Sequence, residues 1–337
     1  MEMIGSLQVK MIAIVLGATN SLLDLELPFG YHLKRMKLKD VSIKDDILSA
    51  SGRLDTKYIA SNLSDDDNPE FIFISKEENM TIPAKYFVLS EMMTGNEQAY
   101  AYFDSIQSTW NHELFLIIFF LHLCKEGNIE IADKYFTFTA NYGCNNIRRN
   151  GKSSLDLPIS VYDDLYEWDN NRKNIYQELI SLSGEILEEM QDVFGRFDRG
   201  YSASRFDDAY KNLVTLSEIL LIGYNSNDKR GDKKIKFSNR ITAALANDAE
   251  ARDMQALAKK CYKDRSDETH EGKNDNIDKD TLSELRCLVR RIIIDFVHYY
   301  KSNYAELSDK SFAGAKRDYV KALLVRVEYL KDNGYIE

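Results

Sequence analysis

The sequence contains few of the residues that interrupt regular structure. Among 337 residues there are only four prolines and 16 glycines, which favours long uninterrupted elements, and helices in particular. A hydrophobic content of 44%, with 11% aromatic residues, is enough for a sizeable core. At this length we expect two domains, or one large domain with additions.

Cysteine is also scarce, and the cysteines present have no paired spacing. They form no C-x-x-C motif, and no histidine lies near them at the spacing of zinc ligands, which argues against a metal site. A disulfide framework is not needed in a chain of this size. We therefore expect a cytoplasmic protein with reduced thiols, no metal ion and no cofactor. The thiols are those of Cys124, Cys144, Cys261 and Cys287.

Long hydrophobic runs and net positive charge are both lacking. The most apolar stretch, Leu114–Leu121, continues only to Cys124, whereas a bilayer span needs about 20 apolar residues. We predict a buried helix there and no membrane partner. The net charge of −10 argues against nucleic-acid binding through bulk electrostatics, so any RNA must be bound by a local basic patch.

The first third of the chain has the pattern of short strands separated by turns. A helix is expected over residues 106–125, and residues 129–139 fit either a helix or a pair of strands. Residues 141–157 are rich in asparagine and basic residues without periodicity, and we predict a linker there. The β-type runs are at 12–16, 58–59, 71–75 and 86–89.

From about residue 162 onward, apolar residues recur at helical spacing. Asn247 or Asp248 is a natural N-cap for the third of these helices. The expected fold class is α+β, with a mixed, strand-containing domain over residues 1–155 followed by an all-helical bundle over 160–337. The expected helices span 174–194, 206–220, 254–262, 282–300 and 319–330.

The most suggestive pair of polar residues is Arg265 and His270, at the end of one of these helices. Arginine keeps its charge, and histidine titrates near neutral pH, so together they offer a phosphate-binding cation and an acid–base group without a metal. Arg265 continues the apolar face of Ala258 and Cys261 and therefore needs an anion. That anion could be Glu218 or an RNA phosphate. The alternative is a structural ion pair at a helix end.

The C-terminal half resembles the HEPN superfamily, and most closely its Apea-like branch. The resemblance rests on the order and spacing of four stretches, at residues 206–221, 236–246, 257–262 and 265–270. It implies a helical bundle that pairs with itself as a homodimer. Many such proteins are metal-independent endoribonucleases, often in bacterial antiviral defence or toxin systems. The N-terminal half matches no family and is expected to sense an activator or inhibitor.

The resemblance also implies a role for individual residues. His270 would act as general acid or base on the ribose 2′-hydroxyl or the leaving oxygen, and Arg265 would hold the scissile phosphate. Glu218 matches the acidic residue that the family carries on an earlier helix, and Ser266 occupies the small polar position after the arginine. RNA is the expected substrate.

One departure from the family pattern favours a different function. Asp267, Glu268 and Thr269 fill a gap that is usually apolar, and Glu271 precedes the glycine. These carboxylates would repel RNA and raise the pKa of His270, which favours an acid role over a base role. The rival hypothesis is a non-catalytic HEPN module that uses the same cleft to bind RNA, a nucleotide or a protein.

Basic residues near the motif are candidates for contacts with the RNA backbone. Six of them lie in a predicted loop over residues 228–240, and two more share a face of the following helix at i and i+4. The alternatives are a solvated loop and ion pairs with neighbouring helices. The candidates are Lys229, Arg230, Lys233, Lys234, Lys236, Arg240, Arg286 and Arg290.

Overall fold

The computed structural model divides the chain into two compact units, residues 1–170 and 171–337. Each unit is described by itself. The structure describes residues 3–41, 70–83, 95–142, 145–153, 165–182, 184–202, 205–222, 230–271 and 277–337.

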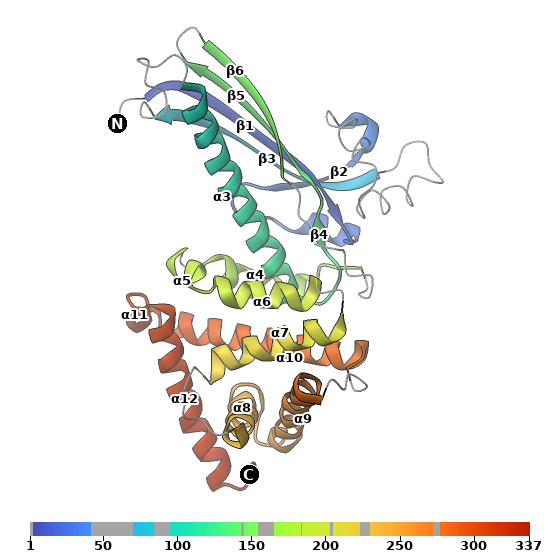
Figure 1. Ribbon diagram of the computed structural model, residues 1–337, viewed down its shortest axis with the longest axis vertical. Helices are drawn as coiled ribbons and strands as arrows, with labels where there is room; N and C mark the ends of the chain where they lie inside the picture. The colour runs from blue at the N-terminus through green and yellow to red at the C-terminus, as the bar shows by residue number, and fades with distance from the viewer. Residues whose placement is uncertain are drawn as a thin grey trace. The chain divides into compact units, whose positions relative to one another are not determined.

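The first unit is built on an antiparallel sheet in the order β2-β3-β1-β5-β6 (Figure 1). The long central strand β1 pairs with β3 on one side and with β5 on the other. The short strand β4 extends the pairing of β1 near its end. The strands are β1 (Met3–Leu16), β2 (His32–Lys37), β3 (Glu70–Pro83), β4 (Glu130–Ile131), β5 (Lys134–Tyr142) and β6 (Asn145–Ser153).

The long helix α3 (Gly95–Cys124) covers one face of this sheet. The ring of Phe103 stacks on Phe138 with centroids 4.9 Å apart, and Trp110 lies 6.1 Å from Phe136. Every second residue of β1 from 7 to 13 is buried on the same face, as the alternation of a strand requires. Among the described residues, no helix is both long and apolar enough to cross a membrane.

The opposite face of the sheet is apolar at one end and polar at the other. The apolar end is closed by the 3-10 helix Leu38–Asp40. At the polar end, Gln8 and Lys10 both contact Glu77, at 2.9 and 3.0 Å. A second 3-10 helix, Asn20–Asp24, follows β1. The apolar cluster consists of Ile14, Leu16, Leu38, Val41, Phe71 and Phe73.

The strands expected at 12–16 and 71–75 are confirmed within β1 and β3, and residues 129–139 form strands rather than a helix. The runs at 58–59 and 86–89 lie outside the described residues. The linker predicted over 141–157 is wrong for residues 145–153, which form β6. The strand is held by its pairing with β5 and by Arg149, whose guanidinium binds Asp104 at 2.9 Å.

The second unit is entirely helical in its described part, which confirms the α+β class with a C-terminal helical domain. A 3-10 turn at Asn170–Arg172 precedes it. Its helices are α4 (Lys173–Ile180), α5 (Gly184–Glu189), α6 (Gln191–Ser202), α7 (Phe206–Leu221), α8 (Arg230–Leu245), α9 (Ala251–Glu271), α10 (Lys279–Ser302), α11 (Tyr304–Leu307) and α12 (Phe312–Asp332).

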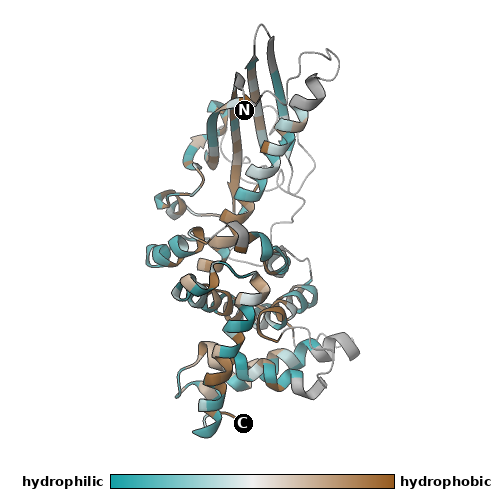
Figure 2. Ribbon diagram, turned by 90° about the vertical axis from the view of Figure 1, so that its left-hand side faces the viewer, coloured by the Kyte–Doolittle hydropathy of each residue, from teal (hydrophilic) through white to brown (hydrophobic). Residues whose placement is uncertain are grey.

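Helix α7 lies at the centre of the helical unit, against α6, α9 and α10. Tyr210, Leu213, Val214, Leu216 and Leu220 on α7 have no exposed surface. Figure 2 shows hydrophobic and hydrophilic residues alternating along the helices, as expected for elements that bury one face. The site described below depends on this central helix.

Three helix boundaries differ from those expected. The helix predicted over 174–194 is split into α4, α5 and the start of α6. The basic loop predicted over 228–240 is helical from Arg230 onward. Neither Asn247 nor Asp248 is the N-cap of α9, because the helix begins only at Ala251; the Asn247 side chain accepts a hydrogen bond from the Glu250 amide at 3.0 Å in the preceding turn. The helix then continues to Glu271, beyond the expected 254–262.

Candidate functional site

The structure brings together two of the residues that the sequence singles out. Arg265 on α9 donates from Nη2 to Oε2 of Glu218 on α7, at 3.4 Å. The other oxygen of Glu218 accepts a hydrogen bond from the hydroxyl of Tyr262 at 3.1 Å. In this cluster of Glu218, Tyr262 and Arg265, the Arg265 and Glu218 side chains are 24% and 20% exposed, whereas Tyr262 is buried. The ion pair between α7 and α9 is therefore part-exposed.

The surrounding helices fix the position of this cluster. The ring of Tyr262 packs against Phe237 of α8 with centroids 5.2 Å apart. At the preceding residue of α9, the Cys261 carbonyl accepts a hydrogen bond from the hydroxyl of Tyr210 on α7 at 3.4 Å. Because Tyr210 and Phe237 are fully buried, α9 is held against both α7 and α8.

Neither Cys261 nor Tyr210 provides a reactive group near neutral pH. Burial raises the pKa of the Cys261 thiol, so the thiol stays protonated and unreactive. Burial also raises the pKa of Tyr210, and the side chain of Cys261 and the charge of Asp264 act in the same direction. Within the described residues, no three His, Cys, Asp or Glu side chains gather as a metal site would need.

The side chains of Ser266 and His270 lie outside the described residues, but the backbone of α9 is continuous through both positions. At about 100° per residue, positions 265 and 270 lie about 140° apart around the helix axis. Position 270 instead falls on the face of Lys259, Lys263 and Ser266, at the spacing i, i+4, i+7 and i+11. Arg265 and His270 thus belong to different faces of one helix.

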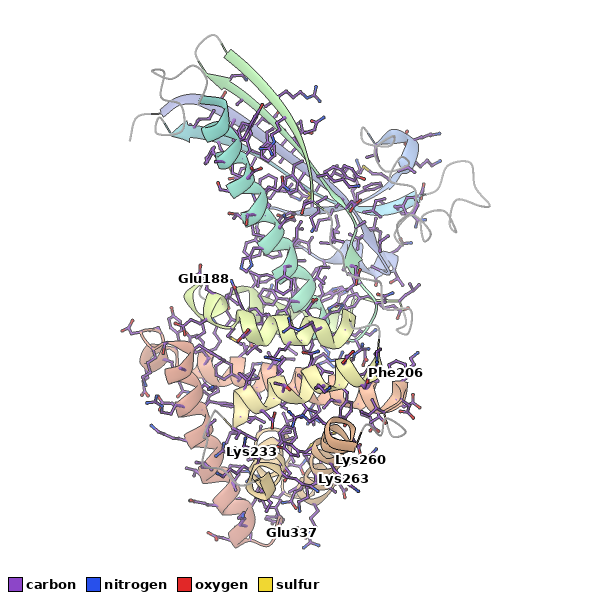
Figure 3. All side chains as sticks on the ribbon, viewed as in Figure 1. Glu188, Phe206, Lys233, Lys260, Lys263 and Glu337 are labelled. Carbon is purple, nitrogen blue, oxygen red and sulfur yellow. The ribbon has the colours of Figure 1, made fainter. Side chains whose placement is uncertain are left out.

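Helices α8 and α9 pack against each other, and each carries basic residues. Lys233, Lys234 and Lys236 on α8 are half-buried, and Lys260 and Lys263 on α9 are exposed. Figure 3 labels Lys233, Lys260 and Lys263 on these neighbouring helices. The side chains of Lys229 and Arg230 lie outside the described residues.

Lys260 and Lys263 were not predicted from the sequence, because the basic candidates lay at 228–240 and on the helix that follows the motif. The signal that could have identified Lys263 is its spacing of seven residues from His270, which places both on one face of a continuous helix.

Three of the arginines proposed for RNA contacts hold the ends of helices instead. Arg286 is buried and donates from Nε and Nη2 to the carbonyl of Gly200 near the end of α6, at 3.0 and 2.9 Å. Arg290 donates to the hydroxyl of Tyr201 at 2.8 Å. Arg240 donates to the carbonyl of Leu221 at the end of α7. We therefore leave these arginines out of the site proposed below.

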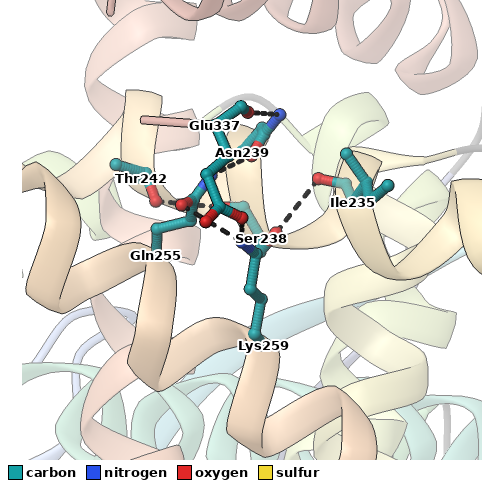
Figure 4. Close-up of polar contacts among 7 residues, drawn as sticks. All are labelled: Ile235, Ser238, Asn239, Thr242, Gln255, Lys259 and Glu337. Carbon is teal, nitrogen blue, oxygen red and sulfur yellow. Dashed lines mark hydrogen bonds and ion pairs between the residues drawn. The ribbon is translucent and has the colours of Figure 1, made fainter. Parts of the chain in front are cut away.

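A layer of polar side chains fixes α8 against α9 beyond the aromatic contact (Figure 4). The amide of Gln255 on α9 donates to Asn239 on α8 at 2.6 Å, and both residues are buried. Asn239 and Lys259 also bind Glu337, the latter through an ion pair of 2.6 Å. Lys259 is therefore engaged within the fold, whereas Lys263 one turn later projects to solvent.

Comparison of the chain with protein-family models, with curated proteins and with solved structures finds no match.

Proposed function

We propose that this chain is a metal-independent endoribonuclease of the HEPN type that acts as a homodimer. In this reaction, the ribose 2′-hydroxyl attacks the adjacent phosphorus and the bond to the 5′-oxygen breaks. The products are a 2′,3′-cyclic phosphate and a free 5′-hydroxyl. His270 moves the proton to or from the reacting oxygens, and Arg265 offsets the charge that develops on the phosphate.

The observation that carries the proposal is the Glu218–Arg265 contact of 3.4 Å between α7 and α9. It supports the pairing inferred from the sequence alone, in which the arginine on the apolar face needs an anion. Glu218 fixes the guanidinium from one side and is itself held by Tyr262. A fixed cation that is still part-exposed is suited to binding a phosphate.

The exposed Lys263 extends the proposed site toward His270. The continuous α9 places positions 263 and 270 on one face, so we assign Lys263 as a phosphate contact beside the acid–base residue. Because Arg265 lies on a different face, a complete site would take His270 from one copy of α9 and Arg265 from another. This is consistent with the homodimer that the resemblance implies.

A role in bacterial antiviral defence or in a toxin system is part of the same proposal.

A binding module without catalytic activity is the second candidate, and one observation favours it. The Arg265 guanidinium already has a carboxylate partner, and the nearby carboxylates Asp267, Glu268 and Glu271 disfavour a second anion. In this alternative the site between α7 and α9 binds RNA, a nucleotide or a protein, and the ion pair is structural.

The test is cleavage of total RNA or tRNA in EDTA by the wild-type chain, Arg265→Ala and His270→Ala. We expect the wild type to leave 2′,3′-cyclic phosphate ends, and each variant to lose about 100-fold or more in rate. The matched controls are Arg172→Ala and His32→Ala, because both side chains are exposed and neither belongs to α7, α8 or α9. Circular dichroism melting curves must show that every variant is folded.

Equal activity of the wild type and both variants would contradict the nuclease proposal. Absence of cleavage, together with RNA binding that requires Lys263 and Arg265, would instead support the binding module. Binding is measured by fluorescence anisotropy with labelled tRNA, with Lys263→Ala compared against Lys301→Ala.

A further inference from the structure

Helix α12 carries an exposed stripe whose centre is apolar. The side of the helix that faces the bundle is buried through Tyr319, Leu323, Val327 and Leu330. On the outer side, Leu324 is 40% exposed and Val325 is 69% exposed. In Figure 1, α12 runs along the edge of the helical unit, where its outer side is not covered by another described helix. Apolar residues in the middle of such a stripe indicate a surface for a partner.

Charged residues extend the stripe in both directions and are separated by sign. Arg317 and Lys321 precede the apolar centre, and Glu328 and Asp332 follow it. With Val325, these positions have the spacing i, i+4, i+8, i+11 and i+15, which keeps them on one face of the helix. All four charged residues are exposed.

The order of these charges is not explained by α12 itself. A helix is stabilised by acidic residues near its first turn and basic residues near its last turn, and α12 has no acidic residue in its first turn. Among the described residues, Arg317, Glu328 and Asp332 form no ion pair, while Lys321 binds Asp318 at 3.0 Å. The pattern therefore calls for a partner outside the helix.

The charges are arranged symmetrically about the midpoint between Leu324 and Val325. Lys321 and Glu328 each lie about 5 Å from it along the axis, and Arg317 and Asp332 each lie about 11 Å from it. In a second helix that runs antiparallel across the same midpoint, each basic residue would face an acidic one. Lys331 and Asp318, which lie beside the stripe, are also equally distant from this midpoint on opposite sides and carry opposite charges.

We propose that two copies of this chain associate through α12, antiparallel and around a two-fold axis near Leu324 and Val325. A two-fold interface uses the same patch on both partners, so the patch must be self-complementary. The symmetric order of charges gives the stripe this property. Leu324 and Val325 of the two copies pack at the centre, and the Arg317–Asp332 and Lys321–Glu328 pairs form twice each. One pair of helices is a small interface, so the association is weak and depends on salt.

This interface is independent of the proposed nuclease. Arg265 and His270 lie on α9, and α12 packs against α7, α8 and α10. A second contact through α9 would make an assembly larger than a dimer. Charge reversal on α12 leaves Arg265 and His270 unchanged, so the α12 contact and the cleavage of RNA are tested by different variants.

The experiment is a concentration series of the full chain by sedimentation velocity at low and high salt. Lys321→Glu places like charges opposite each other at two symmetric positions, and Glu328→Lys does the same. We expect each single variant to weaken self-association by about tenfold or more. The double variant Lys321→Glu/Glu328→Lys should recover it, because the pairs form again with their signs exchanged. The control is Lys10→Glu/Glu77→Lys, an exchange within one chain at a pair in the first unit that is 3.0 Å apart and exposed.

A cysteine substitution tests the axis directly. Val325→Cys, in a chain that also carries Cys144→Ser and Cys287→Ser, should form an intermolecular disulfide on mild oxidation, because residues near the axis are close to their own copies. Asp309→Cys, which is exposed before α12, is the matched control and should not cross-link.

Two outcomes would overturn the proposal. One is a chain that is monomeric at every concentration up to about 1 mM, the weak limit of measurable association. The other is a self-association that neither charge reversal changes, because the contact must then use another face. Melting curves for each variant show whether a loss of association comes from unfolding, and unfolding is not expected at exposed positions.

Discussion

At the scale of single residues, Lys134 is a lysine whose buried position disfavours its charged form. It opens β5, and its side chain is only 2% exposed. Strand alternation places it on the same face as Phe136 and Phe138, under α3. Burial lowers its pKa to about 8, and the neighbouring Asp133 offsets part of this effect.

The free energy of unfolding should therefore rise with pH above neutrality. Between about pH 8 and pH 10, Lys134 is deprotonated in the folded chain but still binds a proton when the chain is unfolded, so raising the pH favours the folded state. Below pH 8 the folded chain carries the cost of a buried cation, which is about 3 kcal/mol at most. Lys134→Met should remove the slope and stabilise the chain at pH 7.

The measurement is the urea midpoint of unfolding at half-unit steps from pH 7 to pH 9.5. Lys34→Met is the matched control, because Lys34 is exposed on β2 and its loss should leave the slope unchanged. An identical slope in the wild type and Lys134→Met would contradict the prediction.

The candidate site shows what sequence reasoning can and cannot recover at this scale. The sequence indicated that Arg265 needs an anion, because an arginine on an apolar helix face requires one, but it left Glu218 and an RNA phosphate as alternatives. The hydrogen bond from the Tyr262 hydroxyl to Glu218 was not predicted. In the sequence, Tyr262 is only one more residue of the apolar stripe. Arg286 was proposed for RNA because sequence does not reveal that the end of α6 offers it a carbonyl.

At the scale of elements, the contact between α6 and α7 depends on a glycine. A Cβ added to Gly200 would lie 2.5 Å from a side-chain carbon of Leu213, which is fully buried on α7. This distance is shorter than real carbon contacts, so the buried Leu213 side chain or one of the two helices must shift. Gly195, one and a half turns earlier on α6, has only the flexible end of Arg199 nearby, at 3.6 Å.

Gly200→Ala and Gly195→Ala should therefore change stability in opposite directions. Alanine at position 200 overpacks the core and should cost about 1–3 kcal/mol. Alanine at position 195 gains helix propensity without a clash and should stabilise by up to about 1 kcal/mol. Urea unfolding monitored by circular dichroism measures both, and a stabilised Gly200→Ala variant would show that α6 and α7 are less closely packed.

Elements with clear periodicity were predicted well, and elements held mainly by their neighbours were not. The stripes of α7 and α9 follow the helical spacing of their apolar residues. Strand β6 contains Asn145, Arg148, Arg149 and Gly151 and has no alternation of its own. It forms because β5 offers a free edge and Arg149 reaches Asp104 and the Tyr100 ring on α3. Tertiary contacts of this kind are not visible in a single sequence.

At the scale of the whole molecule, the continuity of α9 determines how a nuclease site could be assembled. Arg265 turns toward Glu218 on α7, whereas position 270 lies about 140° away around the helix axis. One chain therefore does not bring these residues to the same face. Under the proposed function, a site with both a histidine and an arginine at one phosphate would therefore draw them from two chains.

If the site takes His270 from one chain and Arg265 from the other, two inactive variants should restore each other. In an equal mixture of Arg265→Ala and His270→Ala, half of the dimers combine the two variants, and each of these contains one intact site of two. After subunit exchange we expect about a quarter of wild-type cleavage, measured with labelled tRNA in EDTA. The double variant Arg265→Ala/His270→Ala mixed with the wild type is the control, because its mixed dimers have no complete site. No recovery in the first mixture, despite exchange shown by fluorescence energy transfer, would place both residues of a site on one chain.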